Sequence, residues 1–455
     1  LRIIISSATI DAQSFASFFG PKRIYGPQLS NVSISSDSKG LSKTPAIISI
    51  NTPTFPVECS YLTSTDFIKD ERVVVDAVCR LVEQINSESN VAGDILVFLS
   101  GRSEIDQCCA RLQESTANGE ITNSIRFFKK KRTSTSTETE KKFTIVPIPL
   151  FAGADESEAL RIAQPGQRKV ILATNVAEAS ITIDGVVFVI DTGRMKLRFW
   201  DAEVGFERLC CVPISKASAR QRAGRAGRTK PGRVYRLYSQ AFHDACMPKE
   251  SVAGLQLVDL TATVLQLKAL GVEDVFAFDW IKTPPTSNLQ AAISELKRLG
   301  ALSASSLSLT DPLGKQMAQL PLQPALARVF LHGAIEFKCP QEAAALAAML
   351  TIQQQDSAEQ NCFFNGNAAR KFWVEEGDHM TFVSLFMSYL KNSSKSVRFC
   401  QKFQLNLKSL TTAHRLYCTL IAYLKLFKVD LSSNSASKKE ISELLRRALL
   451  IAFPL

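Results

Sequence analysis

The chain has 455 residues, of which 45% are hydrophobic, and this is enough for about three or four domains of about 100–200 residues each. Its formal net charge of +11 favours a polyanionic partner, and nucleic acid is the first candidate. The sequence has no apolar run long enough for a membrane span and no signal-peptide pattern. Its eleven cysteines form no C-x-x-C pair and no zinc-ligand spacing with the histidines, so we expect reduced thiols in an intracellular protein and no metal cluster.

The N-terminal segment begins directly with an apolar run of residues. Residues 2–6 are apolar and predict a buried strand, and Ala46–Ile50 predicts another. A short amphipathic helix is expected through Phe15–Phe19. A strand that opens at Leu1 without any lead-in is typical of the interior of a domain, so we expect the natural protein to continue upstream.

From residue 66 the sequence alternates between helical and apolar strand patterns, as in a parallel α/β domain. The charged, low-complexity run at 129–142 interrupts this pattern and favours a flexible insertion. Helices are expected over Asp66–Ile85 and from Ser103, and strands over Asp94–Leu99, Phe143–Leu150, Lys169–Ala173 and Val186–Asp191.

After residue 240 the composition shifts to helices rich in Ala, Leu and Gln that are separated by Pro and Gly. This shift predicts a separate helical region. Its clearest helices are expected over Val258–Leu270, Asn288–Leu299 and Gln341–Ile352.

The run Gln221–Arg228 reads Gln-Arg-Ala-Gly-Arg-Ala-Gly-Arg and spaces three arginines with small residues. Glycine and alanine let a backbone approach a ligand, and the planar guanidinium groups of Arg222, Arg225 and Arg228 suit phosphate oxygens. A solvated basic loop is the alternative for any short basic run. The regular glycine spacing and Gln221 argue against that alternative.

Four segments together resemble motifs III, IV, V and VI of the DEAH-box RNA helicases of superfamily 2. The likeness continues towards the C-terminus, where Leu265–Gly271 resembles the family's winged-helix signature, and Thr310–Gly314 with Pro321–Pro324 resembles the entry to its ratchet domain. The four motif segments are Ser7-Ala8-Thr9, Gly93–Gly101, Ala173–Gly185 and Gln221–Arg228.

The resemblance implies an α/β RecA-like parallel-sheet domain of the P-loop NTPase type, followed by a winged helix and an α-helical ratchet domain. It also implies a long β-hairpin near 194–214, between motifs V and VI. The implied divisions are the end of a first RecA-like domain at 1–52, the second RecA-like domain at 53–240, the winged helix at 241–305, the ratchet domain at 306–425, and a linker and the start of an OB-fold at 426–455.

The same resemblance assigns roles in ATP hydrolysis. Arg225 and Arg228 would stabilise charge on the transferring γ-phosphoryl group, and Gln221 would lie against that phosphate or the attacking water. Arg222 is expected to pair with a carboxylate inside its own domain. Nucleotide contacts are implied for Thr182, Asp184 and Gly227, RNA backbone contacts for Thr174 and Asn175, and coupling of the two sites for Ser7 and Thr9.

The implied function is ATP-dependent RNA translocation and unwinding, with pre-mRNA splicing and the nucleus favoured over a cytoplasmic role. ATP and Mg²⁺ are the implied cofactors, RNA is the partner, and spliceosomal proteins or a G-patch-type activator are further partners of a monomer without a membrane anchor. A non-catalytic RNA-binding scaffold and a DNA helicase of the same branch remain alternatives.

Some residues depart from the family pattern. Neither the Walker A loop nor Asp-Glu-Ala-His occurs in the sequence, so we expect these 455 residues by themselves to lack ATPase activity. Ala179 replaces the usual threonine of motif V. Ala163 falls where relatives place a phenylalanine that stacks on adenine, which predicts weak ATP affinity or low base selectivity.

Overall fold

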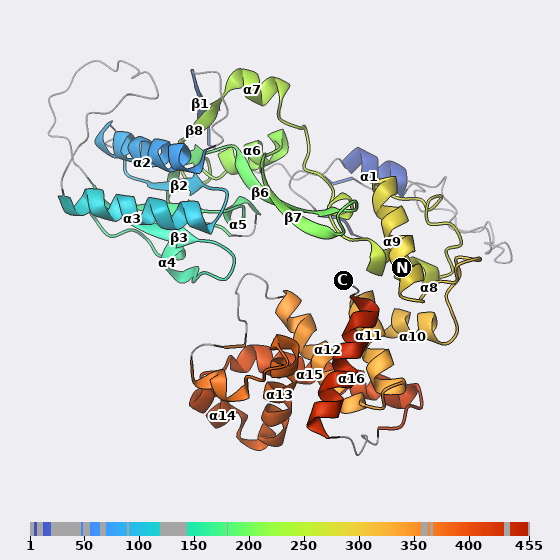
Figure 1. The fold of residues 1–455 in the computed structure, drawn as a ribbon. Coiled ribbons are helices and arrows are strands. Elements are labelled where there is room, and N and C mark those ends of the chain that lie inside the picture. Colours follow the sequence, from blue (N-terminus) through green and yellow to red (C-terminus); the bar gives the residue numbers. More distant parts are fainter. Residues whose placement is uncertain are drawn as a thin grey trace, which may run out of the picture. The chain divides into compact units, whose positions relative to one another are not determined.

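The computed structural model describes residues 4–6, 12–19, 47–48, 55–63, 70–88, 91–118, 143–179, 181–355, 363–364, 367–431 and 437–453. The chain forms two compact units, of which the first takes in residues 1–199 and 207–257, and the second takes in residues 200–206 and 258–455. Figure 1 shows the helices and strands of each unit.

A sheet of six parallel strands forms the centre of the first unit. Parallel neighbours need a crossover, and helices supply it, which is why strands and helices alternate in the sequence. In spatial order the strands are β1 (Val57–Leu62), β8 (Gly232–Ser239), β5 (Val186–Asp191), β2 (Asp94–Phe98), β4 (Gln167–Ala173) and β3 (Thr144–Leu150).

Both faces of this sheet are buried, and the period of two along each strand divides its side chains between them. In β2, Ile95 and Val97 pack under helices α2 (Glu71–Glu88) and α3 (Arg102–Asn118). Leu96 and Phe98 face the other side, in a core that includes Ala223. Figure 1 shows α2 and α3 side by side over one face of the sheet.

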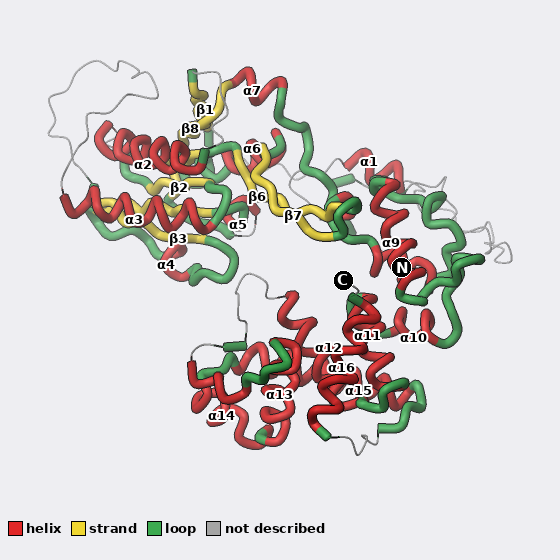
Figure 2. Tube along the Cα trace, in the orientation of Figure 1, coloured by secondary structure: helices red, strands yellow, loops and turns green. Residues whose placement is uncertain are grey.

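The first unit also contains several shorter elements. A two-stranded hairpin, β6 (Arg194–Asp201) and β7 (Phe206–Pro213), confirms the hairpin expected near 194–214 and is drawn in yellow in Figure 2. The remaining helices are α1 (Ala12–Phe18), α4 (Ser157–Leu160), α5 (Val176–Ala179), α6 (Lys216–Ala223), α7 (Gln240–Ala245) and η1 (Gly254–Gln256).

The second unit is helical. Helices α11 and α12 approach closely because Gly333 faces Ala343, and a Cβ atom on Gly333 would lie 2.9 Å from the Ala343 Cβ. The helices are α8 (Thr261–Ala269), α9 (Thr286–Arg298), α10 (Leu313–Gln319), α11 (Pro324–Ile335), α12 (Pro340–Gln355), η2 (Asn367–Phe372), α13 (Asp378–Lys391), η3 (Ser393–Lys395), α14 (Ser396–Phe403), α15 (Leu407–Leu426) and α16 (Lys438–Ala452).

The structure corrects two strand predictions. Residues 4–6 and 47–48, the described parts of the two expected N-terminal strands, are not in strands, and Ile4 is 93% exposed. An apolar segment forms a stable strand only beside a partner strand, and no described strand pairs with either segment. The other predicted strands and helices of the α/β and helical regions are confirmed within a few residues.

Two elements of the sheet were not predicted. β1 pairs with β8, and β8 pairs with β5. The sequences of β1 and β8 mix polar and apolar residues. In the C-terminal stretch for which a linker and the start of an OB-fold were expected, the described residues form α16 and no strand. Leu445 and Ala448 of α16 pack in the main core of the second unit.

Among the described residues, no helix combines the length and the apolar character that crossing a membrane requires.

Candidate active site

The carboxyl ends of three neighbouring strands meet at one edge of the sheet. Phe98 at the end of β2 pairs with Ala173 at the end of β4 and with Asp191 at the end of β5. The loops that leave this edge therefore converge, and ligands of open α/β sheets bind at such an edge. Thr174 and Asn175 directly follow β4, so the sheet brings both predicted RNA contacts to this edge.

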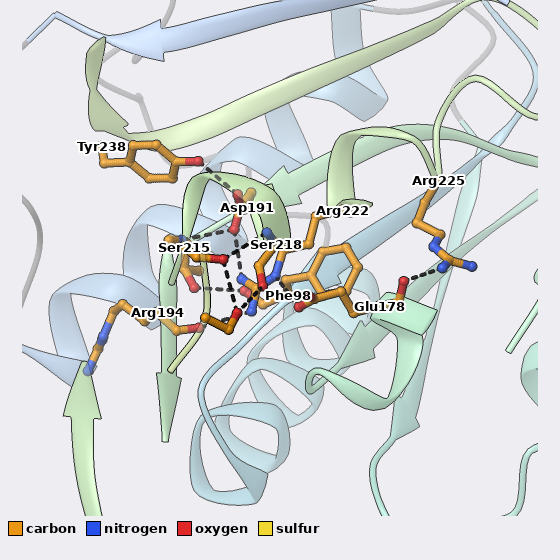
Figure 3. Close-up of polar contacts among 12 residues, drawn as sticks. Phe98, Glu178, Asp191, Arg194, Ser215, Ser218, Arg222, Arg225 and Tyr238 are labelled. Atoms are coloured by element: carbon orange, nitrogen blue, oxygen red, sulfur yellow. Dashed lines mark hydrogen bonds and ion pairs between the residues drawn. The ribbon is translucent and has the colours of Figure 1, made fainter. Parts of the chain in front are cut away.

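Helix α6 carries the arginine octamer to the same edge. Ser215 caps the helix by accepting a hydrogen bond from the Ser218 amide at 3.0 Å. Arg222, in the last turn of α6, is fully buried. It donates through Nη1 to Oδ1 of Asp191 at 2.8 Å and through Nε to Oε2 of Glu178 at 3.2 Å (Figure 3).

Arg222 is buried and binds only groups of its own domain. Burial alone would lower its pKa, but the carboxylates of Asp191 and Glu178 outweigh burial and raise it. The guanidinium also lies 4.8 Å from the centre of the Phe98 ring and donates to the Arg194 carbonyl oxygen at 3.3 Å. The prediction that Arg222 pairs with a carboxylate inside its domain is confirmed.

Asp191 is the centre of this network and was not among the residues predicted from the sequence. Its Oδ2 accepts a hydrogen bond from the Tyr238 hydroxyl at 2.9 Å, and its Oδ1 accepts one from the Gly193 amide at 2.9 Å. Burial, and then the Asp191 charge, raises the pKa of Tyr238. Gly193 has a φ of +70°, and a Cβ there would lie 2.5 Å from the Tyr238 ring. A carboxylate that ends an apolar strand was the available signal.

Arg225 is held differently from Arg222, as Figure 3 shows. It is half-buried, and it donates to the Ile181 carbonyl oxygen at 3.1 Å and to the carbonyl oxygen of Glu178. Burial, with the nearby Arg228 acting in the same direction, lowers its pKa. Within the described part of the chain, neither Arg225 nor Arg228 forms an ion pair. These two charges thus remain available for an anionic ligand.

The other octamer residues differ in exposure. Gln221 is partly buried, and Arg228 is exposed. Gly227 is buried, and its carbonyl oxygen accepts a hydrogen bond from the Phe55 amide at 2.9 Å. A Cβ on Gly227 would lie 2.6 Å from Cγ2 of Val57, so close packing against the start of β1 requires glycine here. Its nucleotide contact stays a prediction.

The predicted residues of the loop after β4 do not all gather at one place. The Thr174 amide donates to the Leu150 carbonyl oxygen at 3.1 Å, and Asn175 beside it is exposed. Thr182 is exposed next to Ile181, which binds Arg225. Asp184 is also exposed, but it precedes the start of β5, about 20 Å along the strand from the carboxyl edge.

A second buried ion pair supports the same edge. Arg194 Nη1 lies 3.2 Å from Oε1 of Glu104, and both side chains are buried. The other carboxylate oxygen of Glu104 accepts a hydrogen bond from the Ser100 amide at 2.8 Å. This pair joins the start of the hairpin to the loop after β2, and it was not predicted.

Ser7 and Thr9, the predicted coupling residues, lie outside the described residues. Within the described ranges no group of three or more His, Cys, Asp or Glu side chains is placed to hold a metal ion. The half-buried Arg225 and the exposed Arg228 carry the planar, always-charged groups that suit the phosphates of a nucleotide.

Three family models match successive parts of the chain. The helicase conserved C-terminal domain matches residues 74–230, which include the sheet edge and the octamer. The helicase associated domain (HA2) matches as its winged-helix part over 292–322 and as its ratchet-like part over 323–382.

The chain is also similar to curated helicases along its whole length. It is 36% identical over 455 residues to the probable ATP-dependent RNA helicase DHX35 homolog of Caenorhabditis elegans, covering 100% of this chain and 56% of that protein. The chain belongs to the DEAH-box helicase family. The human probable ATP-dependent RNA helicase DHX35 is 35% identical over 91% of this chain and 54% of its own length. The chain thus spans about half the length of these relatives.

Other relatives agree with this assignment. The pre-mRNA-splicing factor ATP-dependent RNA helicase prp22 of Schizosaccharomyces pombe is 31% identical over 99% of this chain and 34% of its own length. A crystal structure of the E. coli DExH-box NTPase HrpB has the same fold, with a TM-score of 0.60 and 24% identity over 88% of this chain and 39% of that one. The predicted fold class is confirmed: a RecA-like parallel-sheet domain precedes a winged helix and a helical ratchet domain.

Proposed function

We propose that the intact protein is an ATP-dependent RNA helicase that couples ATP hydrolysis to RNA translocation and to unwinding or remodelling of RNA–protein complexes. The observation that carries this proposal is the position of Arg225. This arginine has neutral acceptors, sits beside the loop after β4, and keeps its charge for a ligand. The relatives that match almost the whole chain are named ATP-dependent RNA helicases, which supports the same activity.

On the nucleotide side, Arg225 and Arg228 would bind the γ-phosphoryl oxygens of ATP presented by another RecA-like domain, and so stabilise the charge that develops during transfer. Gln221 would orient the phosphate or the attacking water. Thr182, Asp184 and Gly227 are proposed nucleotide contacts. Bound Mg²⁺ would neutralise phosphate charge, and among the described residues no group of three or more His, Cys, Asp or Glu side chains is placed to hold it.

On the RNA side, Thr174 and Asn175 would hold the sugar-phosphate backbone without reading bases. Ser7 and Thr9 would couple the nucleotide site to the interface between domains. ATP binding would close the two RecA-like domains and hydrolysis would reopen them, so that the loop after β4 releases and regrips the RNA.

We propose the domain division inferred from the resemblance: 1–52, 53–240, 241–305, 306–425 and 426–455. The ratchet-like match begins at residue 323 and the winged-helix match ends at 322, which favours moving that one boundary towards the C-terminus. Urea-dependent limited proteolysis would test it, because cleavage should concentrate between units that fold independently.

Splicing is the process that we propose, with a nuclear location, because the yeast relative prp22 is named a pre-mRNA-splicing factor. Spliceosomal proteins or a G-patch-type activator would be its protein partners, and the helicase would act as a monomer. Tagging the intact protein and imaging it in cells would test the location, and a purely cytoplasmic signal would contradict it.

The decisive experiment is RNA-stimulated ATP hydrolysis by the intact protein. We expect Arg225→Ala to reduce turnover by about 10³-fold, as for arginine fingers elsewhere, with little change in RNA affinity. The 455 residues alone should not hydrolyse ATP, since they contain no Walker A sequence. Absence of turnover in the intact protein, with RNA binding retained, would favour a scaffold, and stimulation by DNA alone would favour a DNA helicase.

The replacement at Ala163 gives a separate test. This residue lies in the segment between α4 and β4 and is only partly exposed, so it offers no ring on which adenine could stack. We expect the intact protein to hydrolyse GTP and ATP at similar rates. Strong selectivity for adenine would contradict this prediction.

A further inference from the structure

Glu178 is bound by two arginines of the octamer, by one through its side chain and by the other through its backbone. Its Oε2 accepts a hydrogen bond from Nε of Arg222 at 3.2 Å, and its carbonyl oxygen accepts one from Nη2 of Arg225. Figure 3 shows Glu178 with both arginines. The residue lies in the one-turn helix α5, and its side chain is only 14% exposed. A single residue therefore joins the buried arginine of the octamer to the half-buried one.

Arg222 can hold the Glu178 carboxylate in place because Arg222 is itself fixed. Its Nη1 donates to Asp191 at 2.8 Å, and its Nη2 donates to the Arg194 carbonyl oxygen at 3.3 Å. A guanidinium group is planar and rigid, so the two bonds at Nη1 and Nη2 define the direction in which Nε points. The Glu178 carboxylate is thus tied to a donor that cannot turn away from it.

The backbone around Glu178 needs such an anchor. The Glu178 amide donates to the Asn175 carbonyl oxygen at 3.0 Å, and the Ala177 amide donates to the Thr174 carbonyl oxygen at 3.3 Å. A helix as short as α5 is not stable by itself, so tertiary contacts must hold it. Ala177 supplies one contact, because it is buried in the core beside the sheet, and the Glu178 carboxylate supplies the contact with α6.

Arg225 takes its direction from two carbonyl groups whose own residues are anchored. Nη1 of Arg225 donates to the Ile181 carbonyl oxygen at 3.1 Å, and Nη2 donates to that of Glu178. Ile181 is fixed by burial of its side chain in the core, and Glu178 is fixed by its ion pair with Arg222. An arginine side chain has many rotamers, so both acceptors are needed to keep its guanidinium in one place.

We infer that Glu178 is a positioning residue for Arg225. Its carboxylate, bound by Arg222, sets the place of its own carbonyl oxygen, and that oxygen directs the Arg225 guanidinium. This inference rests on the proposed function, in which Arg225 stabilises charge on the γ-phosphoryl group. Placement matters for such a role, because a shift of about 1 Å in a catalytic group can lower turnover by about 10²-fold.

Two conservative changes at Glu178 separate a role in position from a role in charge. Glu178→Gln keeps the length of the side chain and keeps an oxygen that can accept from Nε of Arg222. Glu178→Asp keeps the charge but is shorter by one carbon–carbon bond, roughly 1.5 Å. The shorter carboxylate can reach Arg222 only if the backbone moves, and the carbonyl oxygen that binds Arg225 moves with it. A role in position therefore predicts a larger loss for Glu178→Asp, and a role in charge alone predicts the reverse.

The test is RNA-stimulated ATP hydrolysis by the intact protein, with kcat and the KM values for ATP and RNA measured separately. We expect Glu178→Asp to lower kcat by about tenfold and Glu178→Gln by about threefold, with both KM values unchanged. In the Arg225→Ala background neither change should lower kcat further, because the group that Glu178 directs is gone. The matched control is Tyr238→Phe, which removes one hydrogen bond from Asp191 without altering an acceptor of Arg225, and it should leave kcat unchanged.

Each contrary result has a definite meaning. If Glu178→Gln lowers kcat more than Glu178→Asp does, the charge matters instead of the position, and the inference is rejected. It is also rejected if the losses from Glu178→Asp and Arg225→Ala multiply in the double variant, since Glu178 would then act independently of Arg225. An equal loss in Tyr238→Phe would leave Glu178 with a structural role only.

The same measurements separate this inference from the proposed function. If Arg225→Ala lowers kcat while neither Glu178 variant does, the inference fails and the proposed function stands. If Arg225→Ala leaves kcat unchanged, the assigned role of Arg225 fails and the inference fails with it.

Discussion

The two edges of the sheet in the first unit both bury basic residues, but they use them differently. At the amino edge, Arg168 and Lys169 begin β4 and lie beside Asp94 at the start of β2. At the carboxyl edge, Arg222 is buried between two carboxylates, while Arg225 in the same octamer is bound only by neutral carbonyl groups.

At the amino edge, the basic groups serve the fold. Lys169 donates to the carbonyl oxygens of Ala159, at 3.0 Å, and of Arg161, and its Nζ lies 3.4 Å from Oδ2 of Asp94. Arg168 donates to the Val91 carbonyl oxygen at 2.8 Å. Burial raises the pKa of Asp94, and the charge of Lys169 offsets part of that rise. These contacts tie the segment after α4 to the sheet.

The comparison teaches that a buried arginine or lysine does not by itself mark a functional site. What distinguishes the carboxyl edge is that Arg225 is only half-buried, whereas Arg168 and Lys169 at the amino edge are both buried. The following predictions test this distinction through the free energy of unfolding, in order of decreasing effect.

The largest loss of stability is expected for Arg222→Met. The change leaves Asp191 and Glu178 without their cation in a buried site, and removing one partner of a buried pair costs about 3–5 kcal/mol. Hydrogen exchange of the β5 amides would measure this loss. Arg220→Met on the exposed side of α6 is the control and should change stability by under about 0.5 kcal/mol. Equal effects at the two positions would refute the assigned role of Arg222.

At the amino edge, Lys169→Met should cost about 2–3 kcal/mol at neutral pH, because Asp94 keeps a buried charge without its partner. The pKa of Asp94, already raised by burial, should rise further. The folded protein then binds a proton more tightly than the unfolded chain, so stability is highest at low pH and is lost as pH rises through the raised pKa. Urea unfolding at pH 5 and pH 8 would show this trend, and Lys230→Met, an exposed lysine, should show none.

Tyr238→Phe should have a smaller effect. It removes one hydrogen bond to the Asp191 carboxylate but leaves Arg222 in place, which predicts a loss of about 1.5–2 kcal/mol. Exchange of the β5 amides would again be the measurement. Tyr423→Phe, in the second unit, removes a hydroxyl with no hydrogen-bond partner among the described residues and should be nearly neutral. If Tyr238→Phe left the free energy of unfolding unchanged, the Tyr238 hydroxyl would contribute nothing to holding Asp191 in place.

The smallest effect on stability is expected for Arg225→Ala, below about 1 kcal/mol, because its acceptors are neutral carbonyl groups and the side chain is half-exposed. Arg228→Ala should be equally mild. If Arg225→Ala instead destabilised the first unit as strongly as Arg222→Met, then Arg225 would be a structural residue like Arg168, and the contrast within the octamer would be lost.

Much of the site could be predicted from the sequence because its motifs are local. The spacing of Arg222, Arg225 and Arg228 is set by one helix and its following turn, and Thr174 follows a strand whose last four residues, Val170–Ala173, are apolar. The partners of these residues could not be predicted in the same way. Asp191, 31 residues before Arg222, binds it directly, and Tyr238, 16 residues after Arg222, binds Asp191. The parallel pairing of β5 with β8 brings Asp191 and Tyr238 together.

The sequence by itself determined the alternation of helices and strands and the chemistry of the arginine octamer, because these depend on periodicity and on spacing within a few residues. The hairpin was expected from the family resemblance. The tertiary structure decided which arginine is buried and which is available, because that depends on the carboxylates that distant strands deliver. It also decided that β1 and β8 complete the sheet and that α16 packs into the core of the second unit. Each of those depends on a neighbour remote in sequence, whose surface must be present before the segment has a place to pack.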